Sequence, residues 1–387
     1  MHSSEVSVAV IGGGVVGCAV AHALARRGVG ALLLEAGPGL GLAASGANSG
    51  ILHTGFDSTP GELETRLILR SAALRRKLLG ELGVHVRFCG ARLRPAGGRQ
   101  RTAVEALAAN ARRNGVDAEL AGDGSLRVRG EAITDPVAYV HALAEGAKLG
   151  GAKVRLDARV SGLSSAPGGG VAIRLRDGEE LRARAAVNCA GLHADALARM
   201  AGEEPVRIYP RKGEFLVFRP AAGDSLDEIL LPVPSSMGKG VLVFPSLDGH
   251  MIAGPTARER EDKRDWSVES DARELIEDRA RAMHPALAEA ELLDAYAGLR
   301  PAGRDANYVI EYSRALSGLI HVAAIRSTGL SASLAIREHV SAMLAEQGAV
   351  ALGAARALPV APPGSPPGPW WQRAARHHAE QADGGSR

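Results

Sequence analysis

A glycine-rich turn near the N-terminus constrains the fold of this chain more than any other feature. Residues 6–11 form a short β-branched run, and Gly12, Gly14 and Gly17 follow it in a G-x-G-x-x-G spacing. The first glycine allows a tight turn, the second lets the backbone approach a pyrophosphate, and the third lets the next helix, expected over 18–28, lie close to the sheet. The N-terminus of that helix presents free N–H groups to phosphates. The pattern therefore predicts a dinucleotide-binding unit.

An acidic residue ends the second predicted strand of this unit. The strand covers residues 31–34, and Glu35 follows Gly12 by 23 residues. An acid about 20 residues after the turn is the one that hydrogen-bonds an adenosine ribose. A carboxylate at this place repels a 2′-phosphate, which disfavours NADP. A Rossmann-like fold that has lost its ligand is the alternative.

Composition and cysteine content exclude several classes of function. The formal charge is only +3, and aromatic residues make up 3% of the chain, with no basic block among them, so nucleic-acid binding is not expected. The three cysteines Cys18, Cys89 and Cys189 contain no C-x-x-C pair, which argues for a reducing compartment and against a metal or iron–sulfur site. No apolar run is long enough for a membrane span. We expect a cytoplasmic protein, and peripheral membrane contact stays open.

The remaining pattern predicts an α/β protein with two domains. The predicted helices cover 62–82, 101–114, 136–150 and 269–289; an extended segment covers 154–163, a hairpin 171–187, further strands 208–253, and strand–turn–helix units 187–202 and 318–345. We expect a discontinuous Rossmann-like domain over 1–85, 140–200 and 315–347. An α+β substrate domain with a mainly antiparallel sheet is expected over 86–139 and 201–314.

Residues 348–387 predict a proline-rich C-terminal tail. Its part 358–369 is expected to be flexible or polyproline-like, and 370–387 to lack stable structure. Trp370 and Trp371 are expected to pack on their own chain or to be disordered. Docking of the two tryptophans on a partner or a membrane surface is the alternative.

Four segments of the chain resemble one family of flavoproteins. They are GGGVVG with Glu35, SGANSGILHTGFDSTPGELETRL, GKGVLVFPSLDGHMIAGPTARERED, and AGLRPAGRDANYVIEYS with GLIHVAAIRSTGLSASLAIREHV. The chain resembles the D-amino-acid oxidase superfamily, in the branch of FAD-dependent glycerol-3-phosphate dehydrogenases and L-2-hydroxyglutarate oxidases. The resemblance implies FAD as cofactor and a glutathione-reductase-like FAD-binding domain. Some of those relatives carry a cysteine-rich domain for an iron–sulfur cluster, which this sequence lacks, so oxygen, a quinone or a partner protein stays open as electron acceptor.

The resemblance assigns FAD contacts to glycine- and serine-rich segments. The loop after Glu35 supplies small polar groups for the ribityl-pyrophosphate, and its Gly50 lets the backbone pass near the flavin. A later glycine loop precedes a helix expected to begin near Ser333, whose N-terminus would stabilise negative charge on the reduced flavin; an ordinary strand–helix turn is the alternative. Besides Gly12, Gly14, Gly17 and Glu35, the cofactor residues so assigned are Ser45, Asn48, Ser49, Gly50, Val160, Ala190, Gly191, Gly329, Leu330 and Ser331.

The resemblance also places a histidine, His53, beside the flavin. Oxidation of an alcohol by hydride transfer needs a base for the hydroxyl proton, and a histidine suits that task. A covalent bond to the flavin and a structural histidine are the alternatives. An anionic substrate requires a cation nearby, and Arg300 in AGLRP is the best candidate, because its planar fork matches a carboxylate or phosphate. Further candidates are Arg211, Lys212, Lys239 and Arg326.

These features together predict an FAD-dependent dehydrogenase or oxidase for a small anionic hydroxy compound, without a metal. The expected reaction is hydride transfer to flavin N5, with glycerol 3-phosphate converted to dihydroxyacetone phosphate. L-2-hydroxyglutarate or another 2-hydroxy acid is the second candidate substrate, and an amine or D-amino acid the third. A flavin-binding subunit that only passes electrons within a complex is the alternative outside the enzymes.

Overall fold

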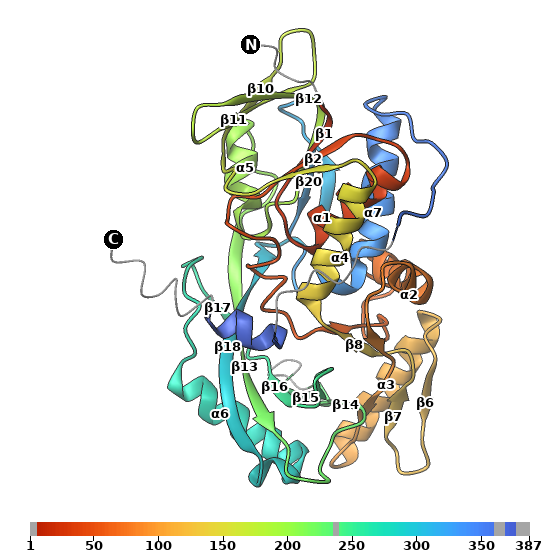
Figure 1. Ribbon diagram of the computed structural model, residues 1–387. Coiled ribbons are helices and arrows are strands. Elements are labelled where there is room, and N and C mark those ends of the chain that lie inside the picture. Colours follow the sequence, from red (N-terminus) through yellow and green to blue (C-terminus); the bar gives the residue numbers. More distant parts are fainter. Residues whose placement is uncertain (1–5, 235–239, 360–367, 377–387) are drawn as a thin grey trace.

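The computed structural model describes residues 6–234, 240–359 and 368–376, and two large sheets form its frame (Figure 1). In the first sheet β1 pairs in parallel with β2 and with β12, and β12 pairs in parallel with β20. Its strands are β1 (Val6–Ile11), β2 (Ala31–Leu34), β9 (Lys153–Arg155), β10 (Val160–Ser165), β11 (Val171–Leu175), β12 (Glu180–Asn188), β19 (Val309–Tyr312) and β20 (Leu319–Ala323). The predicted α/β class is confirmed.

Helices pack on the first sheet and on one another (Figure 1). The central helix, α1, is almost entirely buried because it contacts both α4 and α7. α4 begins where its sequence predicts, since the Asp135 carboxylate accepts the N–H groups of Val137 at 2.8 Å and Ala138 at 2.9 Å and Pro136 takes the first helical position. The labelled helices are α1 (Val15–Arg26), α2 (Leu63–Glu81), α3 (Gly98–Arg113), α4 (Pro136–Leu149), α5 (Ala194–Met200), α6 (Ser270–Met283) and α7 (Gly329–Glu346), with short 3-10 turns at Gly191–His193 and Pro285–Ala288.

The second sheet is mainly antiparallel, as predicted for a substrate domain. Its longest ladder joins β13 to β18, from Ile208 with Gly303 to Arg219 with Glu291, with a shift of register between Val217 and Phe218. One pair, β14 with β5, is parallel. The strands are β5 (Ala91–Leu93), β6 (Ala118–Leu120), β7 (Leu126–Val128), β13 (Ile208–Arg219), β14 (Ile229–Leu231), β15 (Leu242–Pro245), β16 (Met251–Gly254), β17 (Arg258–Glu259) and β18 (Glu291–Gly303). A small third sheet contains β3 (Ile51–Leu52), β4 (Val86–Arg87) and β8 (Ala132–Thr134).

Some element boundaries differ from the sequence prediction. α1 begins three residues earlier than expected, at Val15, and α7 begins at Gly329 rather than near Ser333. Neither helix start carries a side-chain cap, although Thr328 before α7 is of a type that often caps helices. β19 pairs with β20 in the first sheet, whereas residues 309–312 were expected in the substrate domain. The division into two domains otherwise stays a prediction.

The C-terminal tail packs against the end of α1 and against the second sheet. Gly353 and Arg356 donate backbone N–H groups to the carbonyls of Arg27 and Arg26 at the end of α1. Residues 370–376 are helical, so the expectation of no stable structure is wrong for them. Trp370 and Trp371 are only 4% and 3% exposed and join the core of the second sheet. Buried in this way, the tryptophans pack on their own chain, and docking on a partner or a membrane is overturned.

Candidate active site

The glycine-rich turn lies between the carboxyl end of β1 and the start of α1. Gly12 has a φ of +114°, and a Cβ there would lie 2.3 Å from the carbonyl oxygen of Cys189. A Cβ on Gly17 would lie 1.9 Å from the carbonyl oxygen of Gly12. Gly14 is the N-cap residue of α1 and has no side chain to cover the helix end. Apart from the N–H of Val15, which the Ser45 hydroxyl accepts, the turn therefore leaves N–H groups in the first turn of α1 for an anion.

Glu35 and Ser45 meet this turn from two sides. The Glu35 carboxylate accepts the N–H of Gly13 at 2.6 Å and the N–H of Gly37 at 2.7 Å. The Ser45 hydroxyl accepts the N–H of Val15, in the first turn of α1, at 3.0 Å. Each Glu35 oxygen keeps a further lone pair for a ligand hydroxyl. The acid and the serine are thus gathered with the three glycines at one place.

The loop that follows Ser45 is fixed by its own polar groups. The Asn48 side-chain oxygen accepts the N–H of Gly50 at 3.0 Å, and the Ser49 hydroxyl accepts the N–H of Ile51 at 3.3 Å. Gly50 has a φ of +75°, and a Cβ there would lie 2.4 Å from the carbonyl oxygen of Thr134. The close approach that requires this glycine is therefore to Thr134, and an approach of Gly50 to a flavin stays a prediction.

His53 is held by groups from three distant parts of the chain. Its backbone N–H donates to the Ser331 hydroxyl of α7 at 2.8 Å, and its carbonyl accepts from the buried guanidinium of Arg75 of α2 at 2.6 Å. Its ring Nδ1 lies 2.9 Å from the Glu131 carboxylate, between β7 and β8. The imidazole itself is 28% exposed. His53 thus has a fixed backbone and a fixed ring that stays partly exposed.

Glu131 is a site residue that the sequence analysis missed. Its side chain is fully buried, and its second oxygen accepts both the N–H and the hydroxyl of Thr54, at 2.7 and 2.8 Å. Burial opposes the charged form, yet the contacts with His53 and Thr54 lower the pKa of the carboxyl below its usual value. A single acid in an apolar run, GEAIT, is the only signal in the sequence. Its meaning depends on a contact with residue 53, which the sequence does not reveal.

Arg300 lies on the face of β18 that meets the loop after Ser45. Its guanidinium donates to the carbonyls of Arg211 at 2.9 Å, Lys212 at 3.1 Å and Thr256 at 2.8 Å. Two residues away, a Cβ on Gly298 would lie 2.4 Å from the carbonyl oxygen of Ala47. The strand and the loop are therefore in backbone contact beside Arg300.

The charge around Arg300 is positive. Burial, and then the charges of Arg211 and Arg326, lower the pKa of Arg300 to about 10, so the guanidinium stays protonated at neutral pH. Among the described residues no carboxylate forms an ion pair with Arg300, Arg211 or Arg326. Positive charge of this kind suits an anion, and the anion site itself stays a prediction.

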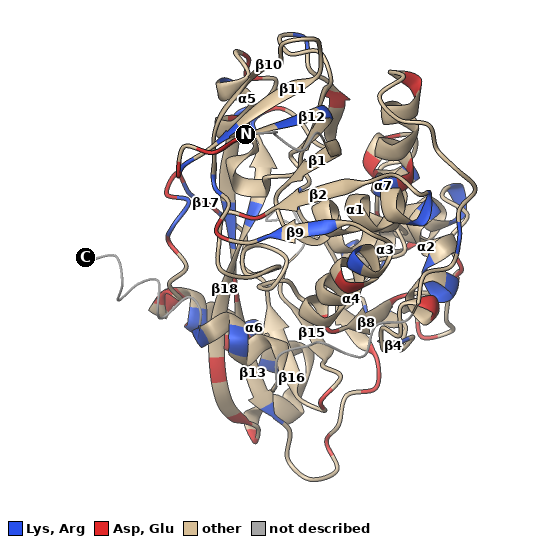
Figure 2. Cartoon of the chain, turned by 45° about the horizontal axis from the view of Figure 1, so that its top comes forward, with Lys and Arg blue, Asp and Glu red and all other residues tan. Residues whose placement is uncertain are grey.

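Lys212 and Lys239 do not join this cluster in the described structure. The Lys212 side chain is fully buried, and its amine donates to Asp265 at 2.9 Å and lies 3.4 Å from Glu269. Basic and acidic residues alternate along the chain around β17 (Figure 2). Lys212 is therefore part of a buried ion-pair network on the face opposite Arg300, and its expected role at the substrate is wrong. Lys239 lies outside the described residues.

Comparison with known proteins identifies the family of this chain. The family model described as FAD dependent oxidoreductase, DAO, matches residues 7–343. The chain belongs to this family. A glycerol 3-phosphate dehydrogenase of Caloramator mitchellensis is 29% identical over 349 residues, which are 86% of this chain and 72% of that protein. An L-2-hydroxyglutarate dehydrogenase of Escherichia coli O17:K52:H18 is 31% identical over 69% of this chain and 68% of that protein.

A solved structure shows the same fold. The L-alpha-glycerophosphate oxidase of Mycoplasma pneumoniae, dithionite-reduced and with FAD bound, superposes with a TM-score of 0.85. The two sequences are 23% identical, and the superposition covers 93% of this chain and 99% of that one. The chain is thus an FAD-dependent oxidoreductase with the fold that its resemblance implied.

The residues at the turn fit the FAD that the DAO family uses. A Cβ at Gly12 or Gly17 would meet backbone, whereas Gly14 borders open space apart from the Ser45 hydroxyl. We expect the α1 N-terminus to hold the pyrophosphate and Glu35 the ribose. The residues expected to lie near the flavin are Gly329, Leu330 and Ser331. They form the first turn of α7, where backbone N–H groups have no helical partner.

Other predicted cofactor residues surround the same turn. The Asn188 side chain accepts the N–H of Ala190 at 3.2 Å, and Gly191 begins the 3-10 turn that follows. Val160 begins β10, two residues after Ala158, whose N–H donates to the Glu35 carbonyl at 2.8 Å. These positions agree with contacts along FAD, and the contacts themselves stay predictions.

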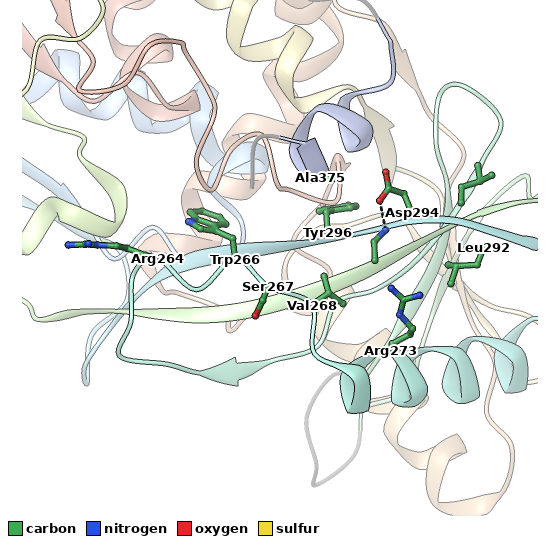
Figure 3. A pocket seen from close by; sticks show the side chains of 11 residues that line it. Arg264, Trp266, Ser267, Val268, Arg273, Leu292, Asp294, Tyr296 and Ala375 are labelled. Atoms are coloured by element: carbon green, nitrogen blue, oxygen red, sulfur yellow. Dashed lines mark hydrogen bonds between the residues drawn. The ribbon is translucent and has the colours of Figure 1, made fainter. Parts of the chain in front are cut away.

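A separate pocket of about 410 Å³ lies between β18, the start of α6 and the C-terminal helix. Figure 3 shows Tyr296 and Asp294 on the strand, Ala375 on the C-terminal helix and Arg273 on α6. None of the residues predicted for the cofactor or the substrate lines it. Across the described ranges of the chain, each helix is too short or too polar to cross a bilayer.

Proposed function

We propose that this oxidoreductase oxidises a small anionic hydroxy compound, with glycerol 3-phosphate as the first candidate. The observation that carries the proposal is the environment of Arg300. Three backbone carbonyls hold its guanidinium, and the neighbouring charges are those of Arg211 and Arg326. Two residues before it on the same strand, Gly298 touches the loop expected to bind FAD. An anion bound by Arg300 would lie beside that loop.

The proposed chemistry divides the work between two side chains. FAD, when bound, supplies the acceptor for the hydride of the carbinol carbon. His53 takes the hydroxyl proton on its partly exposed ring, and its backbone contacts to Ser331 and Arg75 keep it in place. Arg300 binds the phosphate or carboxylate, with Arg211 as a second cation. The substrate is thereby held with its carbinol group between the base and the cofactor.

The relatives named above favour two substrates of this kind. One is a glycerol 3-phosphate dehydrogenase and another an L-2-hydroxyglutarate dehydrogenase. Both named substrates carry a secondary alcohol and an anionic group, which are the two features that His53 and Arg300 would recognise. L-2-hydroxyglutarate is therefore the second candidate.

Anaerobic reduction of the purified, FAD-loaded protein tests the proposal. Glycerol 3-phosphate, L-2-hydroxyglutarate and glycine are each added, and the loss of the flavin absorbance is followed. Bleaching by glycerol 3-phosphate supports the first candidate, and bleaching by L-2-hydroxyglutarate alone supports the second. Bleaching by glycine alone favours an amine oxidase, and a flavin that none of them reduces contradicts the proposal and favours an electron-transfer subunit.

Two variants separate anion recognition from general damage. The three carbonyls use Nε and Nη2 of Arg300 and leave Nη1 for an anion. Arg300→Lys keeps the charge and loses this N–H group, so the substrate Kd should rise roughly ten- to hundredfold while the FAD content is unchanged. Arg304→Lys is the matched control, because Arg304 lies just beyond β18 and pairs on the surface with Glu259 and Glu261. Equal substrate Kd values for Arg300→Lys and wild type would move the anion site elsewhere, with Arg211 as the next residue to replace.

The electron acceptor and the bonding of FAD are tested on the same protein. Reoxidation of the reduced flavin by oxygen, by a quinone or by neither distinguishes an oxidase, a quinone-linked dehydrogenase and an enzyme that needs a partner protein. Acid precipitation tests the covalent alternative for His53. A yellow pellet from wild type that is colourless in His53→Ala would support the covalent bond. We also propose a cytoplasmic location, which fractionation of cells would test.

A further inference from the structure

The buried carboxylate of Glu131 touches the ring of the proposed base directly. Oε2 of Glu131 lies 2.9 Å from Nδ1 of His53. Oε1 accepts the N–H and the hydroxyl of Thr54 at 2.7 and 2.8 Å. The side chain of Glu131 is fully buried, so water does not compete for these contacts. Both oxygens of one anion are thus used to hold residues 53 and 54.

The contact selects one tautomer of the His53 ring. An ionised carboxylate only accepts hydrogen bonds, so the ring nitrogen that faces it must carry the proton. In neutral His53 the proton therefore sits on Nδ1 and the lone pair on Nε2. A base needs that lone pair. The ring nitrogen that can take a proton is then the one that points away from Glu131.

The surroundings of Glu131 suit a positive charge on the ring of His53. Arg75 from α2 is close enough to interact with the carboxylate, but its guanidinium donates to the carbonyls of Leu52 and His53. The charge of Glu131 also acts on Cys89, from the segment before β5, but burial is the main reason that the pKa of its thiol is raised, to about 11. The thiol is therefore neutral near pH 7. When the His53 ring takes up a proton, it becomes a cation in direct contact with the Glu131 carboxylate.

We propose that Glu131 is a positioning residue for the reaction proposed above: it holds His53 with the proton on Nδ1, so that Nε2 accepts the substrate hydroxyl proton. The inference rests on His53 being the base. In that step the O–H bond of the substrate hydroxyl breaks and its proton moves to Nε2. The hydride on the carbon that bears this hydroxyl goes to bound FAD. The products are a carbonyl compound, an imidazolium and reduced flavin. The imidazolium then lies against the Glu131 carboxylate, which stabilises it.

Replacement of Glu131 by glutamine tests this role on the FAD-loaded protein. Glutamine keeps the size of the side chain and removes the charge, so it no longer selects the tautomer. The limiting rate of anaerobic flavin reduction should fall by roughly 10²–10⁴, while the substrate Kd, from the concentration dependence, changes little. The acidic limb of the rate against pH should move to lower pH by about one to three units, because His53 loses its anionic partner.

Two further variants separate the possible failures. Glu119→Gln is the matched control, since Glu119 is an exposed acid on the neighbouring strand β6, and it should keep the wild-type rate and pH profile. His53→Ala reports on the proposed function itself. A wild-type rate in His53→Ala would remove the base and the proposed mechanism with it. A slow His53→Ala together with a wild-type rate and pH profile in Glu131→Gln would overturn the role of Glu131 alone.

A measurement on wild type decides the matter if Glu131→Gln does not fold or does not retain FAD. Long-range ¹H–¹⁵N spectra of ¹⁵N-histidine protein report which ring nitrogen of each histidine carries the proton. Twelve histidines are present, and the His53 signals are those absent from His53→Ala. A proton on Nδ1 in the neutral ring supports the proposal. A proton on Nε2 overturns it.

Discussion

Alanine at two paired glycines should damage two different functions. Gly213 of β13 is the direct partner of Gly298 in β18. A Cβ on Gly298 would lie 2.4 Å from the carbonyl oxygen of Ala47, in the loop proposed to bind FAD. A Cβ on Gly213 would lie 3.0 Å from Nη2 of Arg300 and 2.9 Å from Cβ of Pro255. We therefore expect Gly298→Ala to impair FAD binding and Gly213→Ala to impair anion binding.

The distances set the size of each effect. An ordinary contact begins near 3.4 Å, so the loop at Ala47 must move by about 1 Å, and no rotamer change relieves a clash with backbone. Overpacking of this kind costs about 1–3 kcal/mol, and the higher strand preference of alanine offsets about 0.5–1 kcal/mol. A net loss of about 1–2 kcal/mol in FAD affinity raises the Kd roughly five- to thirtyfold. At Gly213 the guanidinium of Arg300 must move by only a few tenths of an ångström.

Titration of the apoprotein with FAD and anaerobic reduction by substrate measure the two affinities separately. Gly298→Ala should raise the FAD Kd and leave the substrate Kd of the saturated protein within about twofold. Gly213→Ala should do the reverse. The reasoning fails if both variants raise the FAD Kd and the substrate Kd equally, or if neither variant changes either Kd. In those cases Gly298 and Gly213 do not report on separate cofactor and anion contacts.

Three other substitutions test single contacts. Glu35→Ala should raise the FAD Kd roughly ten- to hundredfold in the same titration, through loss of charge-assisted hydrogen bonds. Trp370→Ala should lower the free energy of unfolding by about 3–5 kcal/mol in urea denaturation, because the indole is buried. Burial opposes the ionised form of Glu203, but hydrogen bonds from Ser313 and His321 lower its pKa from 4.5 to about 2. The contribution of Glu203 is then present above pH 4.5 and lost toward pH 2, so Glu203→Gln should lower the free energy of unfolding at neutral pH and change it little near pH 2.

The sequence predicted those parts of the molecule whose causes are local. The turn at Gly12 follows from glycine spacing, and the start of α4 follows from Asp135 and Pro136, whose effects act within a few residues. The start of α7 could not be predicted in this way. The preceding Thr328 carries no side-chain cap, and the Thr328 hydroxyl instead donates to Glu64 from α2, at 2.5 Å.

The parts that the sequence did not predict depend on contacts between distant segments. Lys212 reads like any basic residue, and only the folding of residues 265–269 against it makes it a buried member of an ion-pair network. Glu131 gains its meaning from His53, 78 residues away. The C-terminal helix is short, and Trp370 stabilises it by packing edge-on against Tyr296 at 5.4 Å between ring centres. Such partners are far apart in sequence and leave no periodic signal.

The first turn of α7 connects the two proposed functions of the site. Its backbone N–H groups are expected to face the flavin, and the Ser331 hydroxyl in the same turn accepts the N–H of His53 at 2.8 Å. A helix cannot move one of these groups without the other, because they belong to the same hydrogen-bonded turn. The position of the base is therefore tied to the position of the cofactor. Through this tie, the turn proposed to contact the flavin would also fix the position of His53, the proposed base.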